Sequence, residues 1–513
     1  MIAVTALSLL FSAACIHRPL DHRNVIVVGI ASGPVNLDPR IGTDDASQKA
    51  DQLIFSSLMT LDDHLQVVPQ LAERLDNPDP RTYVATLRRG ILFHDGHELT
   101  SADVVHTFRS LLAPGFISPL RGAFRVLQAV DARDAYTVVF TLTEPFGSFP
   151  FNLVVPPIVP DGADASLRAH PIGTGPYRFV SYADDDRLEL AAFDQYYEGR
   201  PHNDGIILRV VPDDVMRGLE LRKGTLDVDV NDLAPDIVYQ LEREPLLRTI
   251  RSPGTDYQYL GLNLRDPVLH DVRVRQALAS AIDSQGIVQY LRRGLAVPAS
   301  GLIPPVSWAF EADVATFPRD LPRAKRLLDE AGYADPDGDG PRMRFTLTLK
   351  ASNVEFSRLQ SAVIQQNLRE IGVGLDVRTY EFATLYADVL SGNFQMYALQ
   401  WSAGATADPD ILRRVFHSQQ VPPSGFNRGY FDNPQVDRLL DEATVSLDTA
   451  QRRRLFGEVQ RIVAREVPYI SLWQKTNFAV AQRTLTGIRL TPAADLLFLK
   501  DVTRSVPDPP AAH

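Results

Sequence analysis

The chain is predicted to fold as a mixed α/β protein, because strand patterns and amphipathic helix patterns alternate along its length. Segment 25–30 is a dense β-branched run of the kind found in buried strands. Val274, Ala277, Leu278 and Ala281 follow the i, i+3, i+4, i+7 spacing of one helix face. Hydrophobic residues make up 45% and charged residues 22% of the sequence, which is typical of a globular protein with packed cores.

The remaining elements follow in order along the chain. Further strands are expected at 83–87, 137–142, 206–211 and 345–349, and further helices at 324–331, 436–443 and 455–463. Asn433 as cap and Pro434 in the first turn mark the start of one of these helices. A length of 513 residues predicts about three domains at ~150 residues each, and no solenoid-type repeat occurs.

Charge and cysteine content exclude several classes of protein. The net charge is −11 and the sequence pI is about 5.5, which argues against a nucleic-acid partner. The single cysteine excludes an intrachain disulfide framework and an all-cysteine zinc site.

The cysteine stands at the end of an N-terminal apolar segment. Residues 1–14 are apolar or small throughout, too short to span a membrane but suited to an export signal. Cys15 follows directly, and the arrangement resembles a bacterial lipoprotein signal in which this thiol is lipidated. A plain signal peptide with an incidental cysteine is the alternative. We therefore expect export, with Cys15 as a lipid anchor, and a disordered tail at 506–513.

The sequence contains no motif that requires catalysis. There is no Gly-Lys-Ser/Thr phosphate loop and no glycine-flanked nucleophile serine. His94, Asp95, His97 and Glu98 cluster, but Gly96 interrupts them, so a turn is expected instead of a helical zinc site. No catalytic residue, cofactor or metal is predicted.

A partial calcium-loop pattern occurs further along the chain. Asp335, Asp337 and Asp339 match the first half of such a loop, but Thr346 stands where the closing glutamate belongs. A polar turn is the prediction for this segment.

Six sequence blocks in a fixed order resemble those of the family 5 bacterial extracellular solute-binding proteins, the dipeptide- and oligopeptide-binding components of ABC importers. They read NLDP at 36–39, VPQLAE at 68–73, LRRG with FHDG and ADV within 87–104, PIGTGPY at 171–177, DVRVRQAL with AID at 271–283 and KRLLDEAGY at 325–333. Together they extend over nearly the whole mature chain.

The resemblance implies a two-lobed fold of the periplasmic-binding-protein type, class II and large, with an extra inserted domain. Residues 1–15 would be the signal peptide. The first lobe would combine 25–53, 172–262 and 483–505, the inserted domain would cover 54–171, and the second lobe would cover 263–482.

The resemblance also implies where a ligand binds. The matching positions are Ser32, Gly33, Tyr257, Tyr259, Trp401, Gly404, Ala405, Asp408, Trp473 and Lys475. Peptide-binding relatives carry an amine-binding aspartate three residues after the tryptophan. Counting forward from Trp401 gives Gly404, and counting back from Asp408 gives Ala405, so neither position is acidic. Either Asp408 or Asp410 replaces that acid, or the ligand lacks a free amino terminus.

The function implied is that of a non-enzymatic subunit that captures a peptide or another small solute outside the cytoplasmic membrane. It would act as a lipid-anchored, periplasmic or cell-surface monomer and deliver the solute to ABC permease and ATPase subunits by lobe closure. The alternatives are an exported metal-dependent hydrolase using His94–Glu98, and a sensory or chaperone-like binding protein of the same fold.

Overall fold

A computed structural model describes residues 24–163, 166–338 and 340–505. Cys15, the apolar leader and the tail at 506–513 lie outside the described residues, so the predictions made for them stay predictions. Within the described part, no helix has the length and apolar character needed to cross a membrane.

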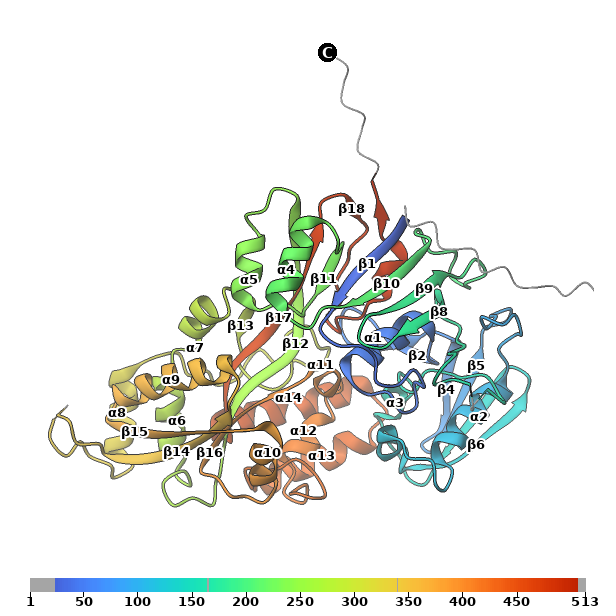
Figure 1. The fold of residues 1–513 in the computed structure, drawn as a ribbon. Helices are drawn as coiled ribbons and strands as arrows, with labels where there is room; N and C mark the ends of the chain where they lie inside the picture. Colours follow the sequence, from blue (N-terminus) through green and yellow to red (C-terminus); the bar gives the residue numbers. More distant parts are fainter. Residues whose placement is uncertain (1–23, 164–165, 339, 506–513) are drawn as a thin grey trace, which may run out of the picture.

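One sheet of eleven strands extends through both lobes (Figure 1). Its order is β15 (Val373–Tyr380), β14 (Phe345–Ser352), β16 (Met396–Trp401), β12 (Leu247–Leu262), β17 (Tyr469–Gln482), β11 (Val228–Val230), β1 (Val25–Ile30), β10 (Gly205–Val210), β9 (Arg187–Ala192) and β8 (Tyr177–Ala183). The eleventh strand, β13 (Ala296–Pro298), pairs with β17. β1 is parallel to β10 and β11, whereas β12 and β17 are antiparallel.

The first lobe is built on β1 and β8–β11. A core of buried apolar side chains joins this sheet to α1 (Asp45–Ile54) and to the C-terminal segment with β18 (Leu485–Thr486), η4 (Leu497–Asp501) and β19 (Thr503–Arg504). A second apolar cluster joins α4 (Asp214–Lys223) and α5 (Pro235–Leu241) to β12 and β17.

A small domain with its own apolar core lies beside the first lobe (Figure 1). Its four-stranded sheet has the order β4 (Ala72–Asp79), β5 (Thr82–Leu87), β7 (Thr137–Leu142), β6 (Leu127–Asp134). It also contains β2 (Met59–Leu61), β3 (Val67–Pro69), α2 (Ser101–Leu112), η2 (Pro119–Phe124) and α3 (Phe149–Asn152).

The second lobe is built on β14, β15 and β16, with one apolar cluster to each side. One cluster includes residues of α6 (Val272–Ala281), η3 (Ile287–Leu291), α8 (Leu321–Glu330) and α9 (Glu355–Arg369), and α7 (Ser284–Gly286) precedes η3. The other includes residues of α10 (Phe382–Leu390), α12 (Ile411–Phe416), α13 (Pro434–Val445) and α14 (Thr449–Glu466). The short helix α11 (Ala403–Thr406) follows β16.

The elements expected from local patterns are present with small shifts in their ends. Strands 25–30 and 137–142 are confirmed to the residue, and Asn433 caps α13 with Pro434 in its first turn. The turn expected at His94–Glu98 is also confirmed, with Gly96 at φ +95°. The polar turn expected for the aspartate segment is present at Asp335, which accepts hydrogen bonds from the backbone N–H groups of Asp337 and Gly338. Asp339 lies outside the described residues.

Candidate functional site

The two lobes are joined through the paired strands β12 and β17, which belong to both halves of the large sheet. β17 pairs with β11 through Ala479 and with β13 through Lys475. The register of β12 against β17 shifts between Pro253 and Tyr257. Since such a shift interrupts the regular ladder and bends a strand, this is the place where a hinge movement of the lobes would be absorbed.

The hinge contains a small polar group that includes one of the predicted binding residues. The Nζ of Lys475 lies 3.9 Å from the carboxylate of Asp256, and Gln400 Nε2 donates to the same carboxylate at 2.9 Å. Burial lowers the pKa of Lys475, and the charge of Asp256 opposes that shift. The structure therefore places Lys475 at the hinge, beside a carboxylate.

Ser32 and Gly33 follow the carboxyl end of β1 on the first lobe. The Tyr182 hydroxyl donates to the carbonyl of Pro34 at 2.8 Å, and a Cβ on Gly33 would stand 2.6 Å from that hydroxyl oxygen. Glycine thus allows the chain to lie against the tyrosine. Ser32 is exposed, and a backbone presented in this way can hydrogen-bond to the main chain of a peptide.

Three of the predicted aromatic residues lie inside the second lobe. Tyr257 and Tyr259 are fully buried with stacked rings, and the Tyr257 hydroxyl shares a 2.6 Å hydrogen bond with Ser471. Burial raises the pKa of both tyrosines. Trp473 is buried as well, and its Nε1–H donates to Gln360 at 3.0 Å. The structure brings these three side chains into packed cores and satisfies their polar atoms there.

The loop after Trp401 lies next to the hinge. Trp401 ends β16 and is 8% exposed. Gly404 and Ala405 lie in α11, where Gly404 is exposed. The Thr406 Oγ1 donates to the carbonyl of Thr255 at 2.7 Å, which ties the end of this loop to β12.

Asp408 and Asp410 lie at the boundary between the second lobe and the small domain. Asp408 accepts a hydrogen bond from the hydroxyl of Ser148 in the small domain at 3.2 Å. Burial and the nearby Asp410 raise the pKa of Asp408 to about 6, while Arg452 opposes the shift. Asp410 accepts from Thr444 at 3.2 Å, and a cavity of about 300 Å³ adjoins Asp408. Both acids therefore take part in contacts at this boundary.

Two arginines that lie against Phe426, one of them also beside Trp401, are marked by no sequence pattern. The Arg428 guanidinium lies 5.1 Å from the Trp401 ring centre and 5.2 Å from that of Phe426. The guanidinium of Arg414 lies 4.6 Å from the centre of the same Phe426 ring. Only the fold brings these side chains together, because a single arginine in a loop has no spacing that could identify it.

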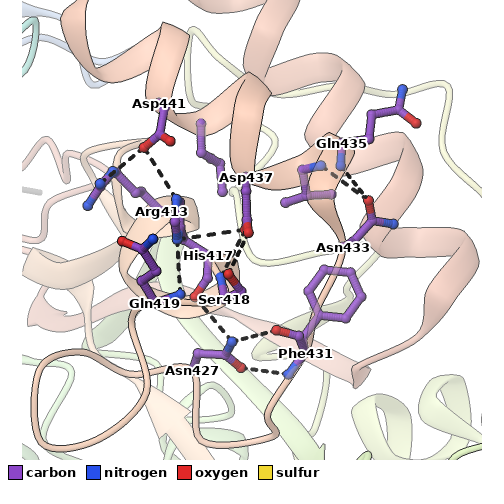
Figure 2. A network of polar contacts seen from close by, with 12 residues as sticks. Arg413, His417, Ser418, Gln419, Asn427, Phe431, Asn433, Gln435, Asp437 and Asp441 are labelled. Carbon is purple, nitrogen blue, oxygen red and sulfur yellow. Dashed lines mark hydrogen bonds and ion pairs between the residues drawn. The ribbon is translucent and has the colours of Figure 1, made fainter.

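The chain between α12 and α13, which carries Phe426 and Arg428, is held by the polar network in Figure 2. His417 Nδ1 accepts from the backbone N–H of Gln419 at 3.1 Å, and its Nε2 lies 3.2 Å from Asp441. Asn427 donates to the carbonyl of His417 and exchanges hydrogen bonds with the backbone of Phe431. The segment that covers Trp401 is therefore well fixed.

The His94–Glu98 cluster has a structural role. His94 Nδ1 accepts from the N–H of Gly173, so Nε2 carries the proton and donates to the Gly175 carbonyl at 3.0 Å. Burial lowers the pKa of His94 to about 4. Within the described ranges, no group of three or more His, Cys, Asp or Glu side chains is placed to hold a metal ion.

Comparison with known proteins agrees with this architecture. The model of the bacterial extracellular solute-binding proteins, family 5, middle region, matches residues 66–423. The oligopeptide-binding protein AppA of Bacillus subtilis is 28% identical over 491 residues, covering 92% of this chain and 90% of AppA. The glutathione-binding protein GsiB of Salmonella choleraesuis is 29% identical over 492 residues, covering 92% of this chain and 93% of GsiB.

Solved structures show the same fold. AppA from Bacillus subtilis in complex with a nonapeptide has a TM-score of 0.74 at 28% identity, covering 94% of this chain and 99% of AppA. The murein tripeptide-binding protein MppA in its unliganded open form has a TM-score of 0.80 at 20% identity, covering 94% of this chain and 98% of MppA. The hydrolase alternative is not favoured by these likenesses. With the family model matching well over half of its length, the chain belongs to the family 5 bacterial extracellular solute-binding proteins.

Proposed function

We propose that this protein captures a peptide or a related small solute outside the cytoplasmic membrane and delivers it to an ABC permease by lobe closure. The observation that carries the proposal is the family match over a chain whose two lobes share the strands β12 and β17. AppA binds oligopeptides and GsiB binds glutathione, so peptides are the first ligands to test. The first lobe, the inserted domain and the second lobe would follow the division expected from the sequence, except that β12 and β17 extend into both lobes.

The ligand would contact both lobes, with the backbone at Ser32 and Gly33 on one side and the loop after Trp401 on the other. A ligand held in this way favours the closed form, because it touches both surfaces only there. In support, the structure has a higher TM-score with the unliganded open form of MppA than with peptide-bound AppA, although the sequence of MppA is less similar. The structure described here would then be an open form.

The binding test uses the purified full chain. Native mass spectrometry would identify a bound solute, and X-ray scattering would compare the ligand-free and ligand-saturated protein. We expect a smaller radius of gyration on saturation, and a gain in unfolding free energy of about 2.7 kcal/mol at a ligand concentration of 100 times Kd. A scattering curve unchanged by every tightly bound ligand would rule out closure.

The anchor and the partners are further parts of the proposal. Cys15 would carry the lipid, and the chain would work as a monomer with separate permease and ATPase subunits. In cell fractionation, Cys15→Ser should move the protein from the membrane fraction to the soluble fraction. If the variant stays in the membrane fraction, the chain carries a plain signal with an incidental cysteine. A sensory role would be favoured if cells that lack the permease still responded to the solute.

A further inference from the structure

We infer that the contact between the small domain and the second lobe is a pivot, which helps to set the axis about which the two lobes close. We call it the boundary contact, and it consists of Gly147 and Ser148 of the small domain with Asp408, Thr444 and Arg452 of the second lobe. The inference rests on the proposed function, because it describes the movement by which the solute would be enclosed.

The small domain is held to the first lobe by buried hydrogen bonds at separate places. The ring of His94 in the small domain donates to the Gly175 carbonyl of the first lobe at 3.0 Å. Arg40 of the first lobe is fully buried, and its guanidinium donates to the hydroxyl of Ser110 at 2.6 Å. The Arg40 carbonyl accepts from the hydroxyl of Ser118 at 2.5 Å. We therefore expect the small domain to move together with the first lobe.

The boundary contact is compact and engages both backbone groups of one glycine. The Gly147 N–H donates to the Thr444 carbonyl at 2.7 Å, and the Gly147 carbonyl accepts from Arg452 at 2.9 Å. Arg452 also donates to the hydroxyl of Ser148, which is buried, at 2.6 Å. A Cβ on Gly147 would stand 2.2 Å from the carbonyl oxygen of Ser446. The small domain and the second lobe thus meet backbone to backbone at one closely fitted point.

Unfilled space lies directly beside this point. The cavity of about 300 Å³ that adjoins Asp408 and Ser148 has walls from both sides of the boundary, namely Leu65, Tyr83 and Phe151 of the small domain and Trp308 and Leu447 of the second lobe. Closely packed surfaces cannot tilt against each other without overlap, whereas a cavity next to a fixed point leaves room for tilting. The Trp308 N–H also donates to the carbonyl of His64, which lies in an exposed turn and can follow a small tilt.

The strands β12 and β17 form the other buried connection between the halves of the molecule. Their register shift between Pro253 and Tyr257 is where we expect the hinge to bend. A rotation that keeps two separate points in place has the line through these points as its axis. The ion pair between Arg293 and Asp236 also links the lobes, but it is exposed, and exposed ion pairs contribute little. The second lobe should therefore turn about a line from the register shift to the boundary contact.

The test measures distances between pairs of spin labels in the ligand-free full chain by pulsed electron paramagnetic resonance. Cys15→Ser removes the native thiol, so that labels attach only to introduced cysteines. The pivot pair, Glu144→Cys with Arg453→Cys, stands on either side of the boundary contact. The cleft pair, Val35→Cys with Val354→Cys, joins the first lobe to the second, and all four positions are exposed. We expect a broad distance distribution for the cleft pair and a narrow one for the pivot pair, because the lobes sample a range of angles about the pivot.

Variants of the boundary contact should release the pivot. Arg452→Met removes the hydrogen bonds to Gly147 and Ser148 and should broaden the distribution of the pivot pair. Ser148→Ala keeps the backbone bonds of Gly147 and should broaden it less, and this milder variant carries the test if Arg452→Met does not fold. Arg454→Met is the matched control, because it changes an exposed arginine of the same helix and should leave both distributions unchanged.

The outcomes separate the pivot from the proposed function. A pivot pair as broadly distributed as the cleft pair in the otherwise unchanged chain would overturn the pivot and leave lobe closure standing. A pivot pair that stays narrow in both Arg452→Met and Ser148→Ala would overturn it too, because these bonds would then not hold the second lobe. Narrow distributions for both pairs would overturn the pivot and speak against hinge motion, while solute binding would still be decided by native mass spectrometry.

Discussion

At the scale of single residues, His94 makes the stability of the folded protein depend on pH. The ring is held neutral between Gly173 and Gly175, and burial lowers its pKa from the usual 6.5 to about 4. Between these two values the unfolded chain takes up a proton that the folded chain does not. The free energy of unfolding should therefore fall as the pH falls from 6.5 to 4.

Urea unfolding at pH 7 and pH 4.5 checks this expectation. His94 should account for about 1–3 kcal/mol of the loss, less than the full shift implies because the ring is partly exposed. His94→Gln should be less stable at pH 7 but lose less stability on acidification. His97→Gln is the control, since His97 lies three residues away and is more exposed. If the free energy of unfolding fell by the same amount between pH 7 and pH 4.5 in the wild type, His94→Gln and His97→Gln, the role assigned to His94 would be contradicted.

The predicted binding residues show what sequence reasoning can and cannot supply at this scale. Ser32, Gly33 and Trp401 were identified by position within motifs, and the structure places them near strand ends. Whether an aromatic residue such as Tyr257 faces a cleft or a core depends on the helices that cover its strand, which no local pattern reveals. The contact of Arg428 with Trp401 could not be predicted for the same reason, because two separate segments carry these residues.

At the scale of elements, the motif at 171–177 fixes a crossing of the chain. Gly175 N–H donates to the Ile54 carbonyl at the end of α1 at 2.9 Å. A Cβ on Gly175 would stand 2.6 Å from the carbonyl carbon of Ile54, so even a methyl group requires backbone movement. Glycine is required here by close approach of two backbones and not by an unusual φ angle.

Gly175→Ala should therefore destabilise the protein by about 1–3 kcal/mol, the usual cost of overpacking a fixed contact. The fall in Tm should accompany weaker hydrogen-exchange protection at the C-terminal end of α1. Gly122→Ala serves as the control, because an added Cβ at Gly122 meets no atom within 4 Å. A Gly175→Ala protein as stable as the control would show that this crossing can relax.

Local elements were predictable because their patterns are contained in a few residues. The strand at 25–30 and the capped helix from Pro434 depend on β-branched content, helical periodicity and capping chemistry, all visible in sequence. The long strands β12 and β17 were not predicted. Their pairing joins Leu247 to Gln482, so the sheet that unites the lobes depends on contacts between distant segments.

At the scale of the whole molecule, Arg452 joins the small domain to the second lobe. Its guanidinium donates to the carbonyl of Gly147 at 2.9 Å and to the hydroxyl of Ser148 at 2.6 Å. It also supplies the positive charge that favours ionisation of the buried pair Asp408 and Asp410. One side chain thus stabilises both the contact between domains and the acids beside it.

Arg452→Met should remove these contacts and leave two buried carboxylates without their main cation. We expect a loss of about 1–3 kcal/mol in unfolding free energy, the cost of leaving buried hydrogen-bond acceptors without their donor. The loss should shrink toward pH 5, because Asp408, whose pKa is already raised to about 6, becomes protonated there. The small domain should also exchange amide hydrogens faster than the lobes, since its attachment is weakened.

The matched control is Arg453→Met, which changes the adjacent, exposed arginine of the same helix. That variant should unfold in one transition at the wild-type denaturant concentration. If Arg452→Met behaved in the same way, the remaining contacts would suffice to hold the small domain to the second lobe. One of them is the hydrogen bond from the backbone N–H of Trp308 to the His64 carbonyl. A separate early transition in Arg452→Met alone would show that this one guanidinium makes the three parts of the molecule unfold together.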